Sequence, residues 1–172
     1  HDRFFYIKNL HQKAEEGNFY IGLKIVRGAY MEKERNRATK MGYLSPIQPS
    51  KSATDVDYDR AIQFCVENLG RISICAGTHN EKSSLLLTEI MKDHQVLEDD
   101  SRIYFSQLLG MSDHISFNLS KVNFNVAKYV PYGPVKEVMP YLIRRADENT
   151  SVAGQTGREL NLIRKELDRR SL

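Results

Sequence analysis

The sequence predicts an α/β fold of about four βα units, equivalent to half of a (β/α)8 (TIM-type) barrel, plus one terminal helix. Short runs rich in β-branched residues alternate with longer amphipathic stretches, a pattern typical of a parallel sheet built from βα units. About 150 residues follow Gly22, whereas a complete barrel needs about 250, so four units fit and eight do not. A small flavodoxin-like sheet also fits this length, but the phosphate-binding loop it normally carries after the first strand is missing.

Length and composition predict a single globular domain over residues 1–172. The chain is 41% hydrophobic and 27% charged, which excludes a disordered or collagen-like chain. It contains no apolar run of about 18 residues, so we expect no transmembrane segment. The net charge of +3 is too small to indicate nucleic-acid binding. The chain has neither an initiator Met nor a signal peptide, and we expect it to be a fragment of a longer protein.

The first elements are a helix over residues 4–16 closed by Gly17, a strand over 21–26 and a polar helix over 32–41. A Pro- and Ser-containing loop over 45–50 follows. In the first helix, the residues expected on the apolar side are Phe5, Leu10 and Ala14.

The middle of the chain predicts a helix capped by Thr54 and running to Leu69, then a strand over 72–76. Asn80 is the expected N-cap of a helix that continues through Met91. The apolar side of the helix that begins at Thr54 should carry Val56, Ala61, Ile62, Cys65 and Val66.

The last elements are a strand over 103–106, a short helix within 107–121 and a strand over 126–130. Pro134 suits the first turn of a helix that ends near Asn149, and a charged helix covers 156–171.

The two cysteines, Cys65 and Cys75, lie in apolar stretches and are expected to be buried free thiols in a reducing compartment, although a disulfide is also possible. Nucleotide-binding glycine motifs, HExxH and CxxC do not occur. The five histidines lack metal-ligand spacing, so we predict no metal site.

Polar residues collect where each predicted strand ends. Ligands of parallel α/β folds bind at the carboxyl ends of the strands, so these residues predict a site, although polar loops are ordinary in any protein. Lys24 and 27–30 close the first strand, 78–80 follow the second, 107–111 follow the third, and Tyr129 with 132–133 ends the fourth.

Lys24 lies within an otherwise apolar strand and is therefore informative. In a barrel interior its ammonium would need a carboxylate or an anionic or polar ligand, because burying an unpaired charge is costly. The alternative is an edge strand that leaves Lys24 in solvent.

Four side chains share one face of the helix predicted after Pro134. Their spacing of i, i+3, i+4 and i+7 places them within about 100° of one another. Two guanidiniums together suit a carboxylate or phosphate, whereas a solvated face with an Arg–Glu pair is the alternative. The residues are Tyr141, Arg144, Arg145 and Glu148.

Six segments, taken together and in order, resemble the proline dehydrogenase family of flavoenzymes. They are 24–30 (KIVRGAY), 53–55 with Tyr58, 78–80 (THN), 107–111 (QLLGM), 129–133 (YVPYG) and 141–149 (YLIRRADEN). The resemblance implies that the chain is the carboxyl-terminal half of the catalytic (β/α)8 barrel. It also implies that the amino-terminal half, with further substrate and flavin residues, is absent.

The resemblance implies FAD as cofactor and oxidation of L-proline to Δ1-pyrroline-5-carboxylate, with hydride transfer to flavin N5. Lys24 matches a basic residue next to flavin N5 that is often Arg in the family. The other implied cofactor contacts are Arg27, Gly28, Ala29, Tyr30, Met31, Lys51, Thr78, His79, Asn80, Gln107 and Ser151.

The resemblance also implies the substrate site. Arg144 and Arg145 match a pair that binds the proline carboxylate, and Glu148 matches a carboxylate that orients them. Leu109, Tyr129 and Tyr141 match residues packed around the substrate ring. The parent enzyme would pass electrons to a quinone or another acceptor, in the bacterial cytoplasm, at a membrane surface, or in mitochondria if it is eukaryotic.

The main alternative concerns this chain alone. An isolated half barrel would expose parallel sheet edges, self-associate as a homodimer and bind no flavin. A different barrel enzyme that binds phosphate with the Arg pair, and a pure binding module, are the remaining alternatives.

Overall fold

The computed structural model describes residues 2–28, 30–151 and 155–170, which form two compact units, His1–Tyr129 and Val130–Leu172. The first unit contains α1 (Arg3–Gly17), β1 (Ile21–Val26), α2 (Met31–Met41), α3 (Lys51–Glu67), β2 (Ile72–Gly77), α4 (Glu81–Asp93), β3 (Ile103–Leu108), α5 (Asp113–Lys121) and β4 (Val126–Tyr129). The second contains α6 (Val135–Ser151) and α7 (Gln155–Arg170).

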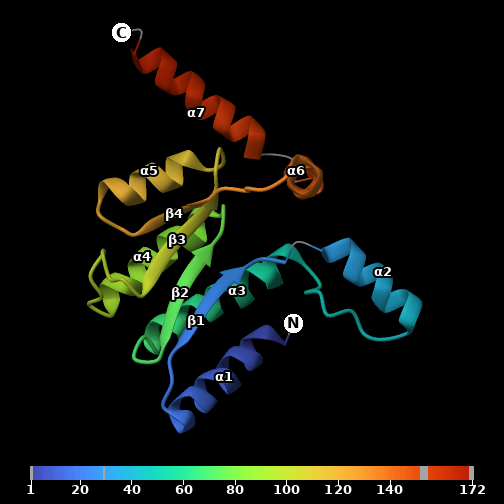
Figure 1. Ribbon diagram of the computed structural model, residues 1–172. Helices are drawn as coiled ribbons and strands as arrows, with labels where there is room; N and C mark the ends of the chain where they lie inside the picture. The colour runs from blue at the N-terminus through green and yellow to red at the C-terminus, as the bar shows by residue number, and fades with distance from the viewer. Residues whose placement is uncertain (1, 29, 152–154, 171–172) are drawn as a thin grey trace. The chain divides into compact units, whose positions relative to one another are not determined.

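The four strands form one parallel sheet in the order β1-β2-β3-β4, as the βα pattern predicted. Figure 1 shows α3 and α4 behind the strands, and α3 packs against β1, β2 and α4. The element order and types are confirmed, with small shifts at the ends: β3 extends to Leu108, so the short helix predicted within 107–121 begins only at Asp113.

The core lies between the sheet and these helices. Side chains alternate between the two faces of a strand, and the face toward the helices carries the buried residues. Ile21 and Ile25 of β1 are buried, whereas the residues between them are more exposed. The largest completely buried side chains include Phe105, Ile62, Ile72, Leu87 and Met91.

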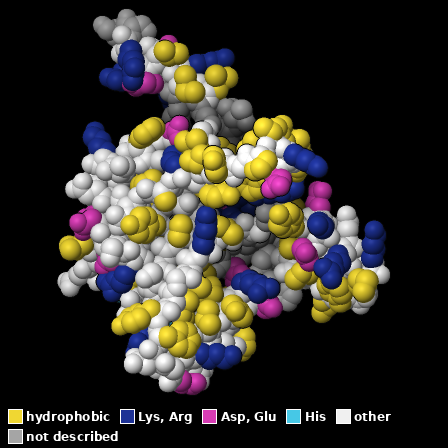
Figure 2. Space-filling view, viewed as in Figure 1, with side chains coloured by type: hydrophobic (Ala, Val, Ile, Leu, Met, Phe, Trp, Pro, Cys, Tyr) yellow, Lys and Arg dark blue, Asp and Glu magenta, His cyan; other side chains and the backbone are white. Residues whose placement is uncertain are grey.

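The opposite face of the sheet, which we call the open face, carries Gly22, Lys24, Val26, Cys75, Gly77, Tyr104 and Tyr129. Val26 is 55% exposed and Tyr104 is 41% exposed. Figure 2, drawn from the same side as Figure 1, shows hydrophobic side chains interspersed with Lys and Arg on the visible surface. The open face therefore combines exposed apolar side chains with the Lys24 cation.

Helix caps explain where two helices begin. Asn80 caps α4 as predicted, because its Oδ1 accepts a hydrogen bond from Ser83 N at 3.2 Å. The prediction of Thr54 as a cap was wrong. Ser50, in extended conformation, caps α3 by accepting from Ala53 N at 3.0 Å, so the helix begins one turn earlier. Such a cap contributes about 1 kcal/mol.

Two residues predicted on apolar helix sides point away from the core. Phe5 is 67% exposed and Val56 is 64% exposed. At 100° per residue, Phe5 lies about 180° from Ala14, and Val56 lies about 180° from Cys65. Ile7 takes the buried position in α1, and Tyr58 does so in α3.

Both cysteines are free thiols, but they differ in burial. Cys65 is fully buried, and desolvation raises the pKa of its thiol to about 12. Cys75 is half-buried on the open face. The prediction of buried free thiols therefore holds fully only for Cys65.

We expect one cysteine of the native chain to react with a thiol reagent at pH 8 and two to react in denaturant. The thiolate is the nucleophile, and Cys65 can form it only when α3 leaves the sheet. Stopped-flow labelling with a chromogenic disulfide measures the two phases, and a Cys75→Ser variant should lose the fast one. Rapid labelling of both thiols would mean that α3 does not pack as described.

Candidate functional site

Three predicted site residues from three successive strand ends are joined by hydrogen bonds. Arg27 follows β1, Thr78 follows β2, and Gln107 is the penultimate residue of β3. Arg27 Nη1 donates to Thr78 Oγ1 at 2.7 Å, and Gln107 Nε2 donates to the Thr78 carbonyl at 3.3 Å. The parallel sheet therefore brings these residues together along one edge, which we call the strand-end rim.

Arg27 is the most connected residue of the strand-end rim. Its Nε donates to Asp55 Oδ1 at 2.7 Å, and its Nη2 donates to Ser83 Oγ at 2.7 Å. The guanidinium carbon lies 4.1 Å from the centroid of the buried Tyr58 ring, a cation–π contact. Arg27 thus links the end of β1 to α3 and α4.

Asp55 uses both carboxylate oxygens. Its Oδ2 accepts from Lys51 Nζ at 2.6 Å, while Oδ1 faces Arg27. Burial alone would raise the pKa of Asp55, but the hydrogen bonds from Lys51 and Arg27 outweigh it and hold this pKa below the ordinary value. Because the folded pKa is depressed, the stabilisation is present at neutral pH and is lost as the pH falls through that pKa.

The turn between β2 and α4 is held from several sides. Asn80 N donates to Thr78 Oγ1 at 3.1 Å, and His79 Nδ1 lies 2.9 Å from Ser112 Oγ at the start of α5. Thr78 is buried, whereas His79 and Asn80 are half-buried. This turn therefore has fixed geometry and presents two polar side chains that are partly accessible.

Gln107 is buried, and both ends of its amide are engaged. Ser116 Oγ donates to Gln107 Oε1 at 2.8 Å, and Nε2 reaches the Thr78 carbonyl. These partners fix the orientation of the amide. In this structure Gln107 therefore connects the end of β3 to the turn after β2 and to α5.

Lys24 is exposed on the edge strand β1, which is the alternative placement that the sequence left open. Its Nζ lies 5.1 Å from the centroid of the Tyr129 ring, at the end of β4. The ammonium therefore reaches over the open face to the strand-end rim.

Gly77 makes room for Lys24. A Cβ on Gly77 would lie 2.7 Å from Val26 Cγ1 and 3.4 Å from Lys24 Cε. Only glycine lets these two side chains cross β2 so closely. Sequence reasoning did not single out Gly77, since a glycine at a strand end resembles any turn residue.

The remaining predicted cofactor residues of the first unit are accessible. Gly28 is exposed with open space around it, and Tyr30 and Met31 are 50% and 45% exposed. Lys51 is exposed, although its Nζ is bound to Asp55. Leu109 is 58% exposed, and its N donates to the Tyr129 carbonyl at 3.0 Å. Ala29 lies outside the described residues.

The second unit contains the predicted substrate helix as α6. Arg145 Cζ lies 5.2 Å from the centroid of the Tyr141 ring, so the i, i+4 spacing brings the two side chains together as expected. Arg144 is exposed. The side chains of Glu148 and Ser151 lie outside the described residues.

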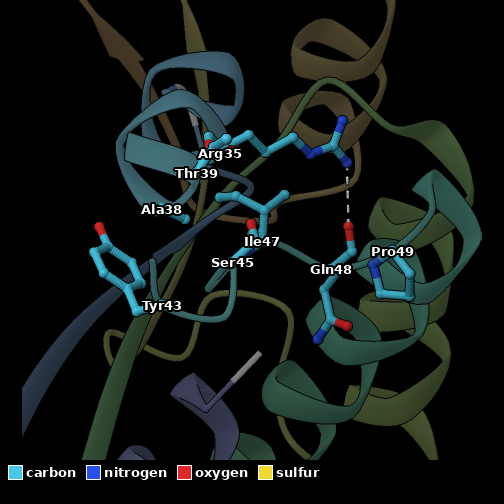
Figure 3. Close-up of a pocket in the computed structure, with 8 residues that line it drawn as sticks. All are labelled: Arg35, Ala38, Thr39, Tyr43, Ser45, Ile47, Gln48 and Pro49. Atoms are coloured by element: carbon cyan, nitrogen blue, oxygen red, sulfur yellow. Dashed lines mark hydrogen bonds between the residues drawn. The ribbon is translucent and has the colours of Figure 1, made fainter. Parts of the chain in front are cut away.

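A cavity of about 460 Å³ lies elsewhere in the first unit, between α2 and the loop that follows it (Figure 3). Arg35 Nη2 donates to the Gln48 carbonyl at 3.4 Å across it. None of the predicted site residues lines this cavity. The strand-end rim, which gathers the polar chemistry, is therefore the candidate site.

Among the described residues, no group of three His, Cys, Asp or Glu side chains is arranged to hold a metal ion. In the same part of the chain, no helix has the length and apolar character needed to cross a membrane.

Comparison with known proteins places this geometry in a family. Residues 1–158 match the family model for proline dehydrogenase. Human proline dehydrogenase 1, mitochondrial, is 43% identical over 160 residues, which cover 91% of this chain and 27% of that protein. Hydroxyproline dehydrogenase from Xenopus laevis is 41% identical, with 87% of this chain and 33% of that protein covered.

A crystal structure of proline utilization A (PutA) from Bdellovibrio bacteriovorus, inactivated by N-propargylglycine, superposes with a TM-score of 0.83 at 25% identity. The match covers 89% of this chain and 16% of that one. The prediction of a partial (β/α)8-type barrel is thereby confirmed. The chain spans between a quarter and a third of the length of the curated relatives. It belongs to the proline dehydrogenase family.

Proposed function

We propose that the full-length protein is a FAD-dependent proline dehydrogenase that oxidises L-proline to Δ1-pyrroline-5-carboxylate. The observation that carries the proposal is the position of Lys24. In a chain of this family, its ammonium lies beside Tyr129 at the strand-end rim. The names of the relatives support the oxidation of proline.

The donors at the strand-end rim suit a flavin. Among the described residues, no carboxylate lies within ion-pair distance of Lys24, so its charge is available to a ligand. Such a cation stabilises negative charge that develops beside it. A bound FAD would supply the hydride acceptor. The residues proposed to hold it are Lys24, Arg27, Gly28, Tyr30, Met31, Lys51, Thr78, His79, Asn80 and Gln107, together with Ala29 and Ser151.

Helix α6 is proposed to bind the substrate. Two adjacent guanidiniums, Arg144 and Arg145, can form charge-assisted hydrogen bonds with the proline carboxylate. The contact of Arg145 with the Tyr141 ring restricts its side chain before substrate arrives. Tyr129 and Leu109 are proposed to pack against the pyrrolidine ring of proline. A carboxylate held in this way orients the substrate for oxidation of the carbon next to nitrogen.

For the isolated 172-residue chain, we propose no activity. Among the described strands, β1 and β4 each pair with one neighbour, and the open face leaves Val26 and Tyr104 exposed. Unpaired parallel edges favour association. The chain alone should therefore form dimers or larger species and bind no flavin, because a barrel site needs residues from several further strands.

The visible spectrum of purified protein with FAD, recorded before and after anaerobic L-proline, tests both proposals. For the full-length protein we expect a bound-flavin spectrum that bleaches with proline. The isolated chain should leave the spectrum of free FAD unchanged. Trans-4-hydroxy-L-proline is the comparison substrate, given the Xenopus relative. A full-length protein that binds no flavin, or whose flavin stays oxidised with proline, would refute the enzymatic proposal.

A further inference from the structure

Thr78 is hydrogen-bonded to three other predicted site residues, Arg27, Asn80 and Gln107. Its Oγ1 accepts hydrogen bonds from Arg27 Nη1 at 2.7 Å and from Asn80 N at 3.1 Å. Its carbonyl accepts from Gln107 Nε2. The position of the turn between β2 and α4 is therefore tied to the position of the Arg27 guanidinium.

The guanidinium is in turn fixed from α3 and α4. Asp55 accepts from Nε, and Ser83 accepts from Nη2. Ser83 Oγ in turn donates to Asp59 Oδ1 at 2.5 Å, and the Tyr58 ring packs against the guanidinium. Two cations, Arg27 and Lys51, face the carboxylate of Asp55. Loss of that charge would break both ion pairs and leave Arg27 with the more distant Asp59, whose Oδ1 lies 4.0 Å from Nη2.

We propose that Asp55 is a positioning residue for the flavin site, acting through Arg27 on the Thr78–Asn80 turn. Three of the five N–H donors of Arg27 are spent on protein partners, so the residue serves chiefly to hold this turn. The inference rests on the proposed function, because it assigns the turn to flavin binding.

The test compares Asp55→Asn with Asp57→Asn in the full-length protein. Asp57 lies on the same helix, but its carboxylate accepts from the neutral Gln48 amide, at 3.2 Å, and pairs with no cation of the described residues. We expect Asp55→Asn to raise the FAD dissociation constant about tenfold or more, as loss of a charge-assisted hydrogen bond would. Asp57→Asn should change it less than about twofold, and Asp55→Glu should restore part of the affinity.

The proline KM at saturating FAD and the melting temperature of the apoprotein separate positioning from general damage. Positioning predicts an unchanged KM, and an FAD affinity loss in Asp55→Asn that persists at temperatures where both Asn variants are fully folded. Equal FAD affinities for Asp55→Asn and Asp57→Asn would overturn the proposal, as would an affinity loss that only follows a loss of folded protein. Failure of the wild-type protein to bind FAD would instead refute the proposed function itself.

Thr78→Val gives a second test that does not depend on the stability of Asp55→Asn. Alone it should also raise the FAD dissociation constant, and an unchanged constant would overturn the proposal. It removes the hydroxyl that connects Arg27 to the turn and leaves the Asp55–Arg27 pair intact. If Asp55 acts along this path, the double variant should bind FAD about as weakly as Thr78→Val alone. Additive effects on the FAD dissociation constant would mean that Asp55 acts by another route, and would overturn the proposal.

Discussion

Replacing Arg145 with alanine in the full-length protein should raise the KM for L-proline by about two orders of magnitude. The guanidinium lies on α6 against the Tyr141 ring, so its side chain is already ordered before it meets the substrate. Removing it would leave the proline carboxylate with one cation, Arg144, in place of two. Arg144→Ala should have a similar effect on KM.

Helix α6 also carries a matched control for the two arginines. Lys136 is an exposed cation of α6 that lies about 180° from Arg145 around the helix. Lys136→Ala should leave KM unchanged. Arg145→Lys should fall between the wild type and the alanine variant, because it keeps the charge and loses the planar fork.

Steady-state kinetics with proline and with pyrrolidine, which lacks the carboxylate, make this prediction specific. The wild type should prefer proline strongly, and Arg145→Ala should lose most of that preference because pyrrolidine offers no carboxylate to bind. An unchanged proline KM in both Arg variants would remove α6 from the substrate site.

The fold was largely predictable from local patterns. The strand over residues 21–26 and the caps and breakers around α4 are determined by short-range chemistry, namely β-branched runs and the Asn80 side chain. Where the prediction went wrong, the apolar side of the helix was right and one residue on it was not, since Ala14 of α1 and Ala61, Ile62, Cys65 and Val66 of α3 are buried as predicted. Phe5 and Val56 are apolar residues on outer helix faces, and single exposed apolar residues are common in folded proteins.

The start of α3 shows a second limit of local reasoning. Ser50 and Thr54 are four residues apart, and each has a hydroxyl that can cap a helix. The choice between them depends on how the loop before α3 returns to the sheet, which no local pattern encodes. Ser50 takes the extended conformation there and closes the first turn.

The residues of the candidate site were predictable, but the hydrogen bonds that join them were not. Strand-end positions identified Arg27, Thr78 and Gln107 because the ends of parallel strands share one edge. The partners of Arg27 lie 28, 51 and 56 residues away along the chain. Asp55 was part of a family-like segment, but its role follows only from the distance to Arg27.

The second large effect concerns Lys24. Lys24→Met should lower the kcat of the full-length protein by about two orders of magnitude, with little change in the proline KM. The cation lies on the open face beside Tyr129, and none of the described carboxylates pairs with it. Its charge should therefore favour the electron-rich form of the cofactor more than it favours bound substrate.

Lys24→Arg tests whether the charge at this position matters, and Lys92→Met is the control for loss of a lysine elsewhere. Arginine keeps the charge and should retain most of the activity, while Lys92 is an exposed lysine in the last turn of α4 whose loss should change nothing. The midpoint potential of the bound flavin, measured by anaerobic titration, should become more negative in Lys24→Met and stay near the wild-type value in the other two. A lowered kcat with an unaltered midpoint potential would contradict a role for the Lys24 charge. It would mean that the Lys24 side chain acts by packing on the open face, where it crosses Gly77.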